Sequence, residues 1–264
     1  MKPGKKNVFF VIVILVFLAA FFAFSAKKPA SKQEKANIAD NQAESSLKGE
    51  IAETEQPEPA PEENTEKPAE DPKPQIPEKF SLDTPFYSQA PLSKWDAFHE
   101  DMCEEASVLN AALYLEEKKL TKEQFEAELQ KMQNAEKKEI GEWKSTTVTQ
   151  IKKVSDIYFD GKIKSKIIDN PTIEDIEAEI AAGHPVVVPL AGRDIGNPNF
   201  TPPGPVYHML TIKGYDTQNF ITNDVGTRKG NSYPYKKGVI MKNMHDWNEK
   251  DIHLGEKRLL VLYK

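Results

Sequence analysis

Residues 27–79 contain almost no apolar side chains and consist mainly of Pro, Glu, Ala and Lys, as in AETEQPEPAPEENTEKPAEDPKPQIPEK. Such a stretch cannot bury enough apolar surface to offset the conformational entropy that folding removes. Its prolines and mutually repelling charges favour an extended, disordered tether. A folded domain is therefore expected only in residues 80–264, which are long enough to build one sizeable core.

The start of the sequence also lies outside that domain. The run VFFVIVILVFLAAFFAF, residues 8–24, carries no charge and follows three lysines. Its length matches a helix across a bilayer, so residues 1–26 are expected to form a single-pass signal anchor in the cell membrane. Ala23 and Ser25 also fit a processing site, and cleavage there would give a secreted protein. Lysines flank the run on both sides and leave its orientation open. We expect the domain outside the cytoplasm, where a tether has a purpose.

Charge and cysteine content exclude several classes of protein. The net charge of −6 and the absence of a basic stripe with aromatic residues argue against a nucleic-acid partner. A single cysteine excludes an internal disulfide framework and a Cys-rich zinc site. His245 and His253 lack ligand spacing to each other and to this cysteine. We therefore expect no metal, no cofactor and a monomeric domain.

Residues 80–264 read as helices followed by strands. Helical spacing of apolar residues begins near Cys103 and again in Leu120–Met132, where Thr121 is the expected N-cap. A third helix is expected in NPTIEDIEAEIAAGHP, with Thr172 as N-cap and Gly183 at its end. Strands are expected at residues 185–190, 206–215, 219–224, 238–244 and 258–264. This order indicates an α+β domain with a largely antiparallel sheet.

Cys103, the only cysteine, stands in EDMCEEASVLNAALYL at the start of the first expected helix. Unpaired N–H groups and the positive end of the helix dipole favour a nucleophilic thiolate at such a position. Cysteine is also often simply a small buried hydrophobe, and Glu104 and Glu105 add negative charge that opposes a thiolate. A thiolate paired with a protonated histidine is possible when Glu104 and Glu105 point to solvent, and we expect them to do so.

Three further residues complete a possible catalytic group. In GPVYHMLTIKGYD, His208 opens an alternating strand, and a hairpin through the following turn brings Asp224 back towards it. Asp216 is an alternative third member, but its place in the turn explains it structurally. Gln89, ahead of the helix, can join the Cys103 N–H group in binding an oxyanion.

Other histidines and tryptophans have simpler explanations. His99 lies in a polar loop and is expected to be exposed, and His184 falls in a turn between a helix and a strand. The tryptophans, Trp95, Trp143 and Trp247, are expected to be core or cleft-wall residues.

The sequence resembles the papain-like cysteine peptidases of family C thirty-nine. The resemblance rests on Gln89, Cys103, His208 with its G-Y-D turn, and the N-D pair ending at Asp224. These are similar to bacteriocin-processing double-glycine peptidases, and the resemblance covers nearly all of residues 80–264. It implies a papain-like fold with a helical half and a sheet half facing each other across a cleft. It also implies roles for Cys103 as nucleophile, His208 as general base and acid, Asp224 as orienting group and Gln89 in the oxyanion hole.

The sequence departs from that family at one place, because many members have Gly-Pro where Glu104 and Glu105 follow the cysteine. No ATP-binding motif or transporter segment follows the domain, so coupled export is not implied.

Three functions remain open. The first is a membrane-tethered cysteine peptidase acting on a peptide or protein. The second is a cell-wall peptide amidase, although the usual D-C-S-G start is absent. The third is a non-catalytic binding module on the same fold.

Overall fold

The computed structural model describes residues 76–141 and 144–264. The expected anchor, residues 1–26, and nearly all of the expected linker, residues 27–79, lie outside the described residues. In the part that is described, no helix combines the length and apolarity needed to cross a bilayer.

Most helices come in the first half of the domain and most strands in the second half. The helices are α1 (Ala97–Glu100), α2 (Cys103–Leu115), α3 (Lys122–Ile140), α4 (Val148–Phe159), α5 (Ile173–Ala181), α6 (Lys237–Asn243) and the short 3-10 helix η1 (Ile252–Leu254). The strands are β1 (Phe80–Ser81), β2 (Lys164–Asp169), β3 (Val186–Ala191), β4 (Tyr207–Tyr215), β5 (Asn219–Asn223), β6 (Tyr233–Lys236) and β7 (Arg258–Tyr263).

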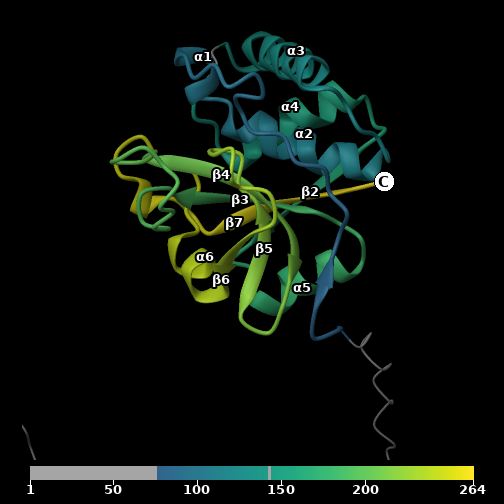
Figure 1. The fold of residues 1–264 in the computed structure, drawn as a ribbon, viewed down its shortest axis with the longest axis vertical. Helices are drawn as coiled ribbons and strands as arrows, with labels where there is room; N and C mark the ends of the chain where they lie inside the picture. The colour runs from purple at the N-terminus through teal and green to yellow at the C-terminus, as the bar shows by residue number, and fades with distance from the viewer. Residues whose placement is uncertain (1–75, 142–143) are drawn as a thin grey trace, which may run out of the picture. The chain divides into compact units, whose positions relative to one another are not determined.

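All described strands belong to one antiparallel sheet. Its order is β2-β7-β3-β4-β5-β6, and β1 pairs separately with the end of β4, opposite Gly214 and Tyr215. Figure 1 shows α2, α3 and α4 on one side of this sheet and α5 and α6 on the other. The expected α+β class is confirmed, with the addition that helices cover both faces.

The two faces of the sheet support two separate apolar cores. On β7, Leu260 and Leu262 pack under α2, α3 and α4, whereas Leu259 and Val261 pack against α5 and α6. Side chains alternate between the faces of a strand, so a strand covered on both sides needs apolar residues throughout. This explains the continuous apolar runs VVVPLA in β3 and LLVL in β7.

Local capping signals fix the helix starts that the sequence indicated. Thr121 and Thr172 each cap a helix and form a reciprocal capping box with the residue three positions later. Gly183 follows α5 with a φ of +89°, a backbone conformation that favours glycine.

One predicted strand is wrong. Residues 238–244 were expected to form a strand, but the structure has helix α6 there. A short apolar run does not by itself distinguish the two. Ile240 of α6 and the following Met244 are buried in the core, and Val239 and Met241 pack against it. Helix α4 and strands β2 and β6 are elements that the sequence reading did not identify.

Candidate active site

Cys103 is the first residue of α2, a helix that is buried on almost every side. Its side chain is 5% exposed and lines a cleft of about 1050 Å³. The Met209 N–H of β4 donates to Cys103 Sγ at 3.4 Å, and Thr211 Oγ1 donates to the Ser107 carbonyl at 2.9 Å. These contacts seat the helix on the sheet, with the sulfur beside the His208–Met209 peptide.

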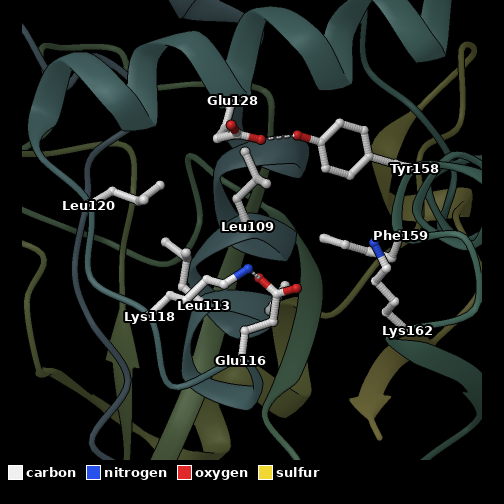
Figure 2. Close-up of a pocket in the computed structure, with 10 residues that line it drawn as sticks. Leu109, Leu113, Glu116, Lys118, Leu120, Glu128, Tyr158, Phe159 and Lys162 are labelled. Carbon is white, nitrogen blue, oxygen red and sulfur yellow. Dashed lines mark hydrogen bonds and ion pairs between the residues drawn. The ribbon is translucent and has the colours of Figure 1, made fainter.

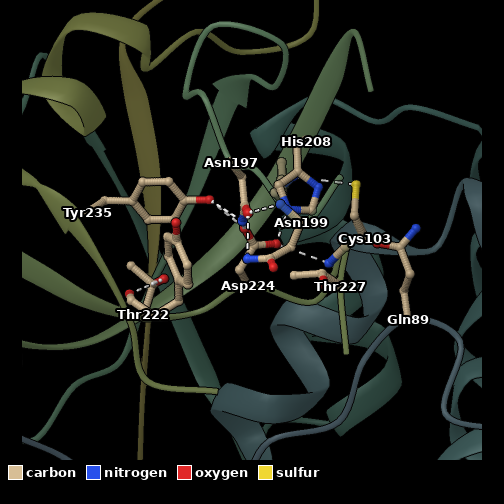
Figure 3. Close-up of polar contacts among 12 residues, drawn as sticks. Gln89, Cys103, Asn197, Asn199, His208, Thr222, Asp224, Thr227 and Tyr235 are labelled. Carbon is tan, nitrogen blue, oxygen red and sulfur yellow. Dashed lines mark hydrogen bonds and ion pairs between the residues drawn. The ribbon is translucent and has the colours of Figure 1, made fainter. Parts of the chain in front are cut away.

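His208 and Asp224 meet across the β4–β5 hairpin, as the sequence predicted. His208 Nε2 lies 2.8 Å from Asp224 Oδ1, and both side chains are buried. Figure 3 shows the other ring nitrogen on the side of the Cys103 sulfur. The histidine therefore stands between the carboxylate and the thiol. Asp216 stays in the turn, where its Oδ1 accepts from the N–H groups of Gln218 and Asn219.

Asp224 is held by more than the histidine. Its Oδ2 accepts from Tyr235 Oη at 2.6 Å and from Asn197 Nδ2 at 2.8 Å, and its Oδ1 also accepts from the Gly226 N–H. Burial would raise the pKa of Asp224, but the charge of His208 and the three side-chain hydrogen bonds outweigh burial and lower it. The carboxylate is thus kept ionised. Asn197 and Tyr235 were not identified from the sequence.

Gln89 reaches the site through a segment threaded between α2 and the end of β5. Asn110 of α2 accepts from the Tyr87 N–H and donates to the Tyr87 carbonyl, and the Gln89 N–H donates to the Val225 carbonyl. Gln89 Nε2 donates to the carbonyls of His99 at 2.7 Å and Glu100 at 3.2 Å. The amide nitrogen thus faces the backbone of α1, and the amide oxygen lies on the Cys103 side (Figure 3).

The expectation that Glu104 and Glu105 point to solvent is wrong, since each is 1% exposed. Other elements surround α2, so Glu104 and Glu105 are enclosed by protein although the neighbouring Cys103 borders the cleft. The Cys103 thiol donates to Glu104 Oε2 at 2.9 Å, and Glu105 faces Glu136 of α3. Burial raises the pKa of Cys103 well above its ordinary value, and the charge of Glu104 and the hydrogen bond to it raise it further.

The cleft beside Cys103 has aromatic and charged walls. Trp95, Trp247 and Phe200 line it, together with Arg193, Arg228, Lys229, Glu100 and Asp101. Trp95 and Trp247 were expected as core or cleft-wall residues, and Trp143 lies outside the described residues. The His208 side of the cleft is tightly fitted, because a Cβ on Gly226 would lie 2.8 Å from His208 Cε1.

A second, smaller pocket of about 260 Å³ lies between α2, α3 and α4. Figure 2 shows its apolar floor, which includes Leu109 and Leu113, and the contact between Tyr158 and Glu128 at its edge. It contains none of the predicted site residues, so the chemistry of the domain is assigned to the larger cleft.

The expectation that His99 is exposed is also wrong. It is 4% exposed in α1, with Nδ1 2.7 Å from Asp96 and Nε2 2.9 Å from Glu126, and its carbonyl holds Gln89. His184 pairs with Glu179 at the predicted turn. Across residues 76–141 and 144–264, no cluster of three His, Cys, Asp or Glu side chains has the arrangement of a metal site.

Three comparisons with known proteins were made. The sequence profile of the Peptidase_C39 like family matches residues 81–250. A crystal structure described as that of a candidate C39-like peptidase from Bacillus anthracis aligns with a TM-score of 0.49 and 16% identity. That alignment covers 71% of this chain and 98% of the other. No curated protein sequence matches the chain.

Proposed function

This chain belongs to the Peptidase_C39 like family, and from that membership we propose that it is a cysteine peptidase that hydrolyses peptide bonds through Cys103, His208 and Asp224. The substrate is a peptide or protein that enters the cleft lined by Cys103 and His208. We further propose that residues 1–26 anchor the enzyme in the membrane and that residues 27–79 hold its domain outside the cytoplasm.

The observation that carries the proposal is the order of contacts around His208. Nε2 is bound to an ionised, fully buried Asp224, while Cys103 Sγ accepts a hydrogen bond from the residue next to His208 in β4. In this arrangement Asp224 fixes the ring orientation, and Nδ1 receives the thiol proton. The thiolate attacks the substrate carbonyl, the imidazolium protonates the leaving amine, and water then releases the acyl group.

The negative oxygen of the tetrahedral intermediate needs donors near the start of α2. The Cys103 N–H lies at the positive end of that helix. Gln89 would contribute its amide only if the group turns towards Cys103 and one of its hydrogens leaves a carbonyl that it now binds. The longer contact, 3.2 Å to the Glu100 carbonyl, is the one that a substrate oxygen would replace. Gln89 therefore acts in this proposal after the substrate has bound.

One observation favours the alternative of a non-catalytic binding module. The Cys103 thiol is buried, donates to a carboxyl group and has a raised pKa. A thiol in that state is a poor nucleophile until its proton moves to another group.

The proposal is tested by covalent capture, which needs no knowledge of the cleavage motif. The full chain is treated with a peptide-epoxide or peptide-aldehyde probe, and labelled protein is measured by mass spectrometry. Wild type and His184→Ala are expected to be captured equally, because His184 binds Glu179 away from the cleft. Cys103→Ser and His208→Ala are expected to lose capture almost completely, because nucleophile and base act as one unit. Folded wild type that is never captured would support the binding module.

A further inference from the structure

Glu104 is a buried carboxyl group in direct contact with the sulfur that the proposed reaction uses. Cys103 Sγ donates to its Oε2 at 2.9 Å, and the Thr146 N–H donates to its Oε1 at 2.8 Å. The side chain is 1% exposed, so both oxygens are fixed by protein groups. A buried charged group is stable only when it is paired or when it becomes neutral.

The groups around Glu104 give it no such ion pair. Glu105 follows it on α2, and Glu136 faces this pair from α3. Tyr207 of β4 and Asp246 lie on the sheet side, and the backbone of Lys144 bonds Glu136. The titratable side chains that face the site are those of Cys103, Glu105, Glu136, Tyr207, His208 and Asp246, and Asp101 acts on Glu136. No described salt bridge involves Glu104. Its carboxyl group therefore has a hydrogen-bonding role and no charge partner.

We propose that Glu104 is a further catalytic residue: in its protonated form it donates a hydrogen bond to the Cys103 thiolate, and in its ionised form it holds the thiol proton and blocks attack. This inference rests on the proposed peptidase function and adds to it a residue that decides when the nucleophile is active.

The protons balance without any further reactant. Cys103 gives its proton to His208 Nδ1, which leaves a thiolate and an imidazolium. Glu104 keeps its own proton and directs it at Sγ. Burial raises the pKa of Glu104 to about 8, and hydrogen bonds from Cys103 and Thr146 oppose that rise. The protonated form therefore predominates at neutral pH, and the ionised form appears only in alkaline solution.

The first test uses unmodified full-length protein. Its single cysteine makes iodoacetamide a specific reporter, so the alkylation rate of Cys103 is measured from pH 5 to 10. A solvent-exposed thiol reacts faster at every step to higher pH, because the thiolate fraction only increases. Here we expect the rate to fall above about pH 8 as Glu104 ionises. A rate that rises through a single ionisation over this range overturns the inference, whatever happens with the variants.

The second test fixes Glu104 in its neutral state. In Glu104→Gln the amide oxygen still accepts from the Thr146 N–H, and the amide NH₂ group replaces the carboxyl hydrogen facing Sγ. We expect this variant to keep its reactivity in alkaline solution and to react about tenfold faster than wild type at pH 9, equivalent to about one unit in thiol pKa. Glu105→Gln is the matched control, since it removes the neighbouring buried carboxyl that does not touch the sulfur. It is expected to retain the alkaline fall.

The outcomes separate this inference from the proposed function. If Cys103 is alkylated and captured by peptide probes but Glu104→Gln has the wild-type pH profile, only the role of Glu104 is wrong. If Glu105→Gln removes the alkaline fall as completely as Glu104→Gln, the effect belongs to the whole acidic cluster and the inference also fails. A thiol that is unreactive at every pH in folded wild type, but reactive after denaturation, overturns both proposals.

Discussion

At the scale of single residues, Asp224 combines complete burial with ionisation. A buried carboxylate is costly unless several donors satisfy it, and Tyr235, Asn197 and the Gly226 N–H supply those donors in addition to His208. The pKa of Asp224 is lower in the folded protein than in an unfolded chain. Its ionisation therefore stabilises the fold above the ordinary carboxyl pKa of about 4, and this contribution is lost as pH falls through the lowered folded value.

Asp224→Asn is expected to remove this pH dependence as well as the orientation of His208. Between pH 7 and 3, the free energy of unfolding should fall less steeply in the variant than in wild type, as measured by urea denaturation at each pH. Peptidase activity should drop on the order of a hundredfold or more, since the amide fixes the histidine poorly. Parallel stability curves for the two proteins would contradict the assigned state of Asp224.

Gly226 places the backbone directly against the histidine ring. Gly226→Ala is expected to push His208 aside, because the new Cβ would lie 2.8 Å from Cε1, and a displacement of about 1 Å can reduce catalysis on the order of a hundredfold. Gly238→Ala is the control, since nothing lies within 4 Å of a Cβ there and alanine stabilises helices by up to about 1 kcal/mol. Steady-state rates and thermal unfolding of both variants give the comparison. Equal activities would show that the ring has room to move.

Sequence analysis identified residues whose positions follow from local patterns and missed those that reach the site only in the folded domain. Cys103, His208 and Asp224 were accessible because a helix start and a hairpin are local patterns. Tyr235 and Asn197 were not, because β6 and the loop after β3 meet Asp224 only in the folded domain. Glu104 and Glu105 were misplaced for the same reason, since adjacent charged residues usually indicate a solvated helix face.

At the scale of elements, α2 holds the extended segment that carries Gln89. The Asn110 side chain bonds both backbone groups of Tyr87, and it also donates to the Ala106 carbonyl. Asn223 reinforces the same segment by donating to the Pro85 carbonyl at 2.8 Å. An extended strand-like segment is thus fixed by side-chain amides where no neighbouring strand pairs with it.

Asn110→Ala should release this segment. We expect a loss of about 2 kcal/mol in unfolding free energy, because the partly buried N–H and carbonyl of Tyr87 lose their partners. Activity should fall with it, as Gln89 loses its position. Asn243→Ala on α6, which breaks a single bond to the Asp194 carbonyl, should cost about 1 kcal/mol and leave activity unchanged. Guanidinium denaturation and peptide hydrolysis measure the two effects. Similar losses in both variants would argue against a special role for Asn110.

Element assignment from sequence succeeded where capping and periodicity agreed. For α4, the Thr147 capping box with Gln150 was a usable signal, and the sequence analysis did not use it. For α6, no side-chain cap marks the start, and a strand was predicted from its apolar run alone. In α6 the contacts of Ile240 and Met244 with the core overrule the strand that the apolar run suggested.

At the scale of the whole molecule, the proposed tether makes a prediction about location. The protein should fractionate with membranes, and protease added to intact cells or protoplasts should release a soluble domain by cutting between about residues 27 and 79. Lysed cells are the control for access, and immunoblotting with an antibody to the domain detects the fragment. Protection in intact cells together with cleavage after lysis would mean that the domain faces the cytoplasm.

β7 lies inside the sheet, between β2 and β3, and this position affects when the domain can fold during synthesis. A ribosome makes Cys103 and His208 well before residues 258–263, yet the strand that supports β3, and through it β4, is among those late residues. The sheet that aligns the two groups cannot close earlier. A growing chain therefore carries both groups before the strand that completes their sheet has been made.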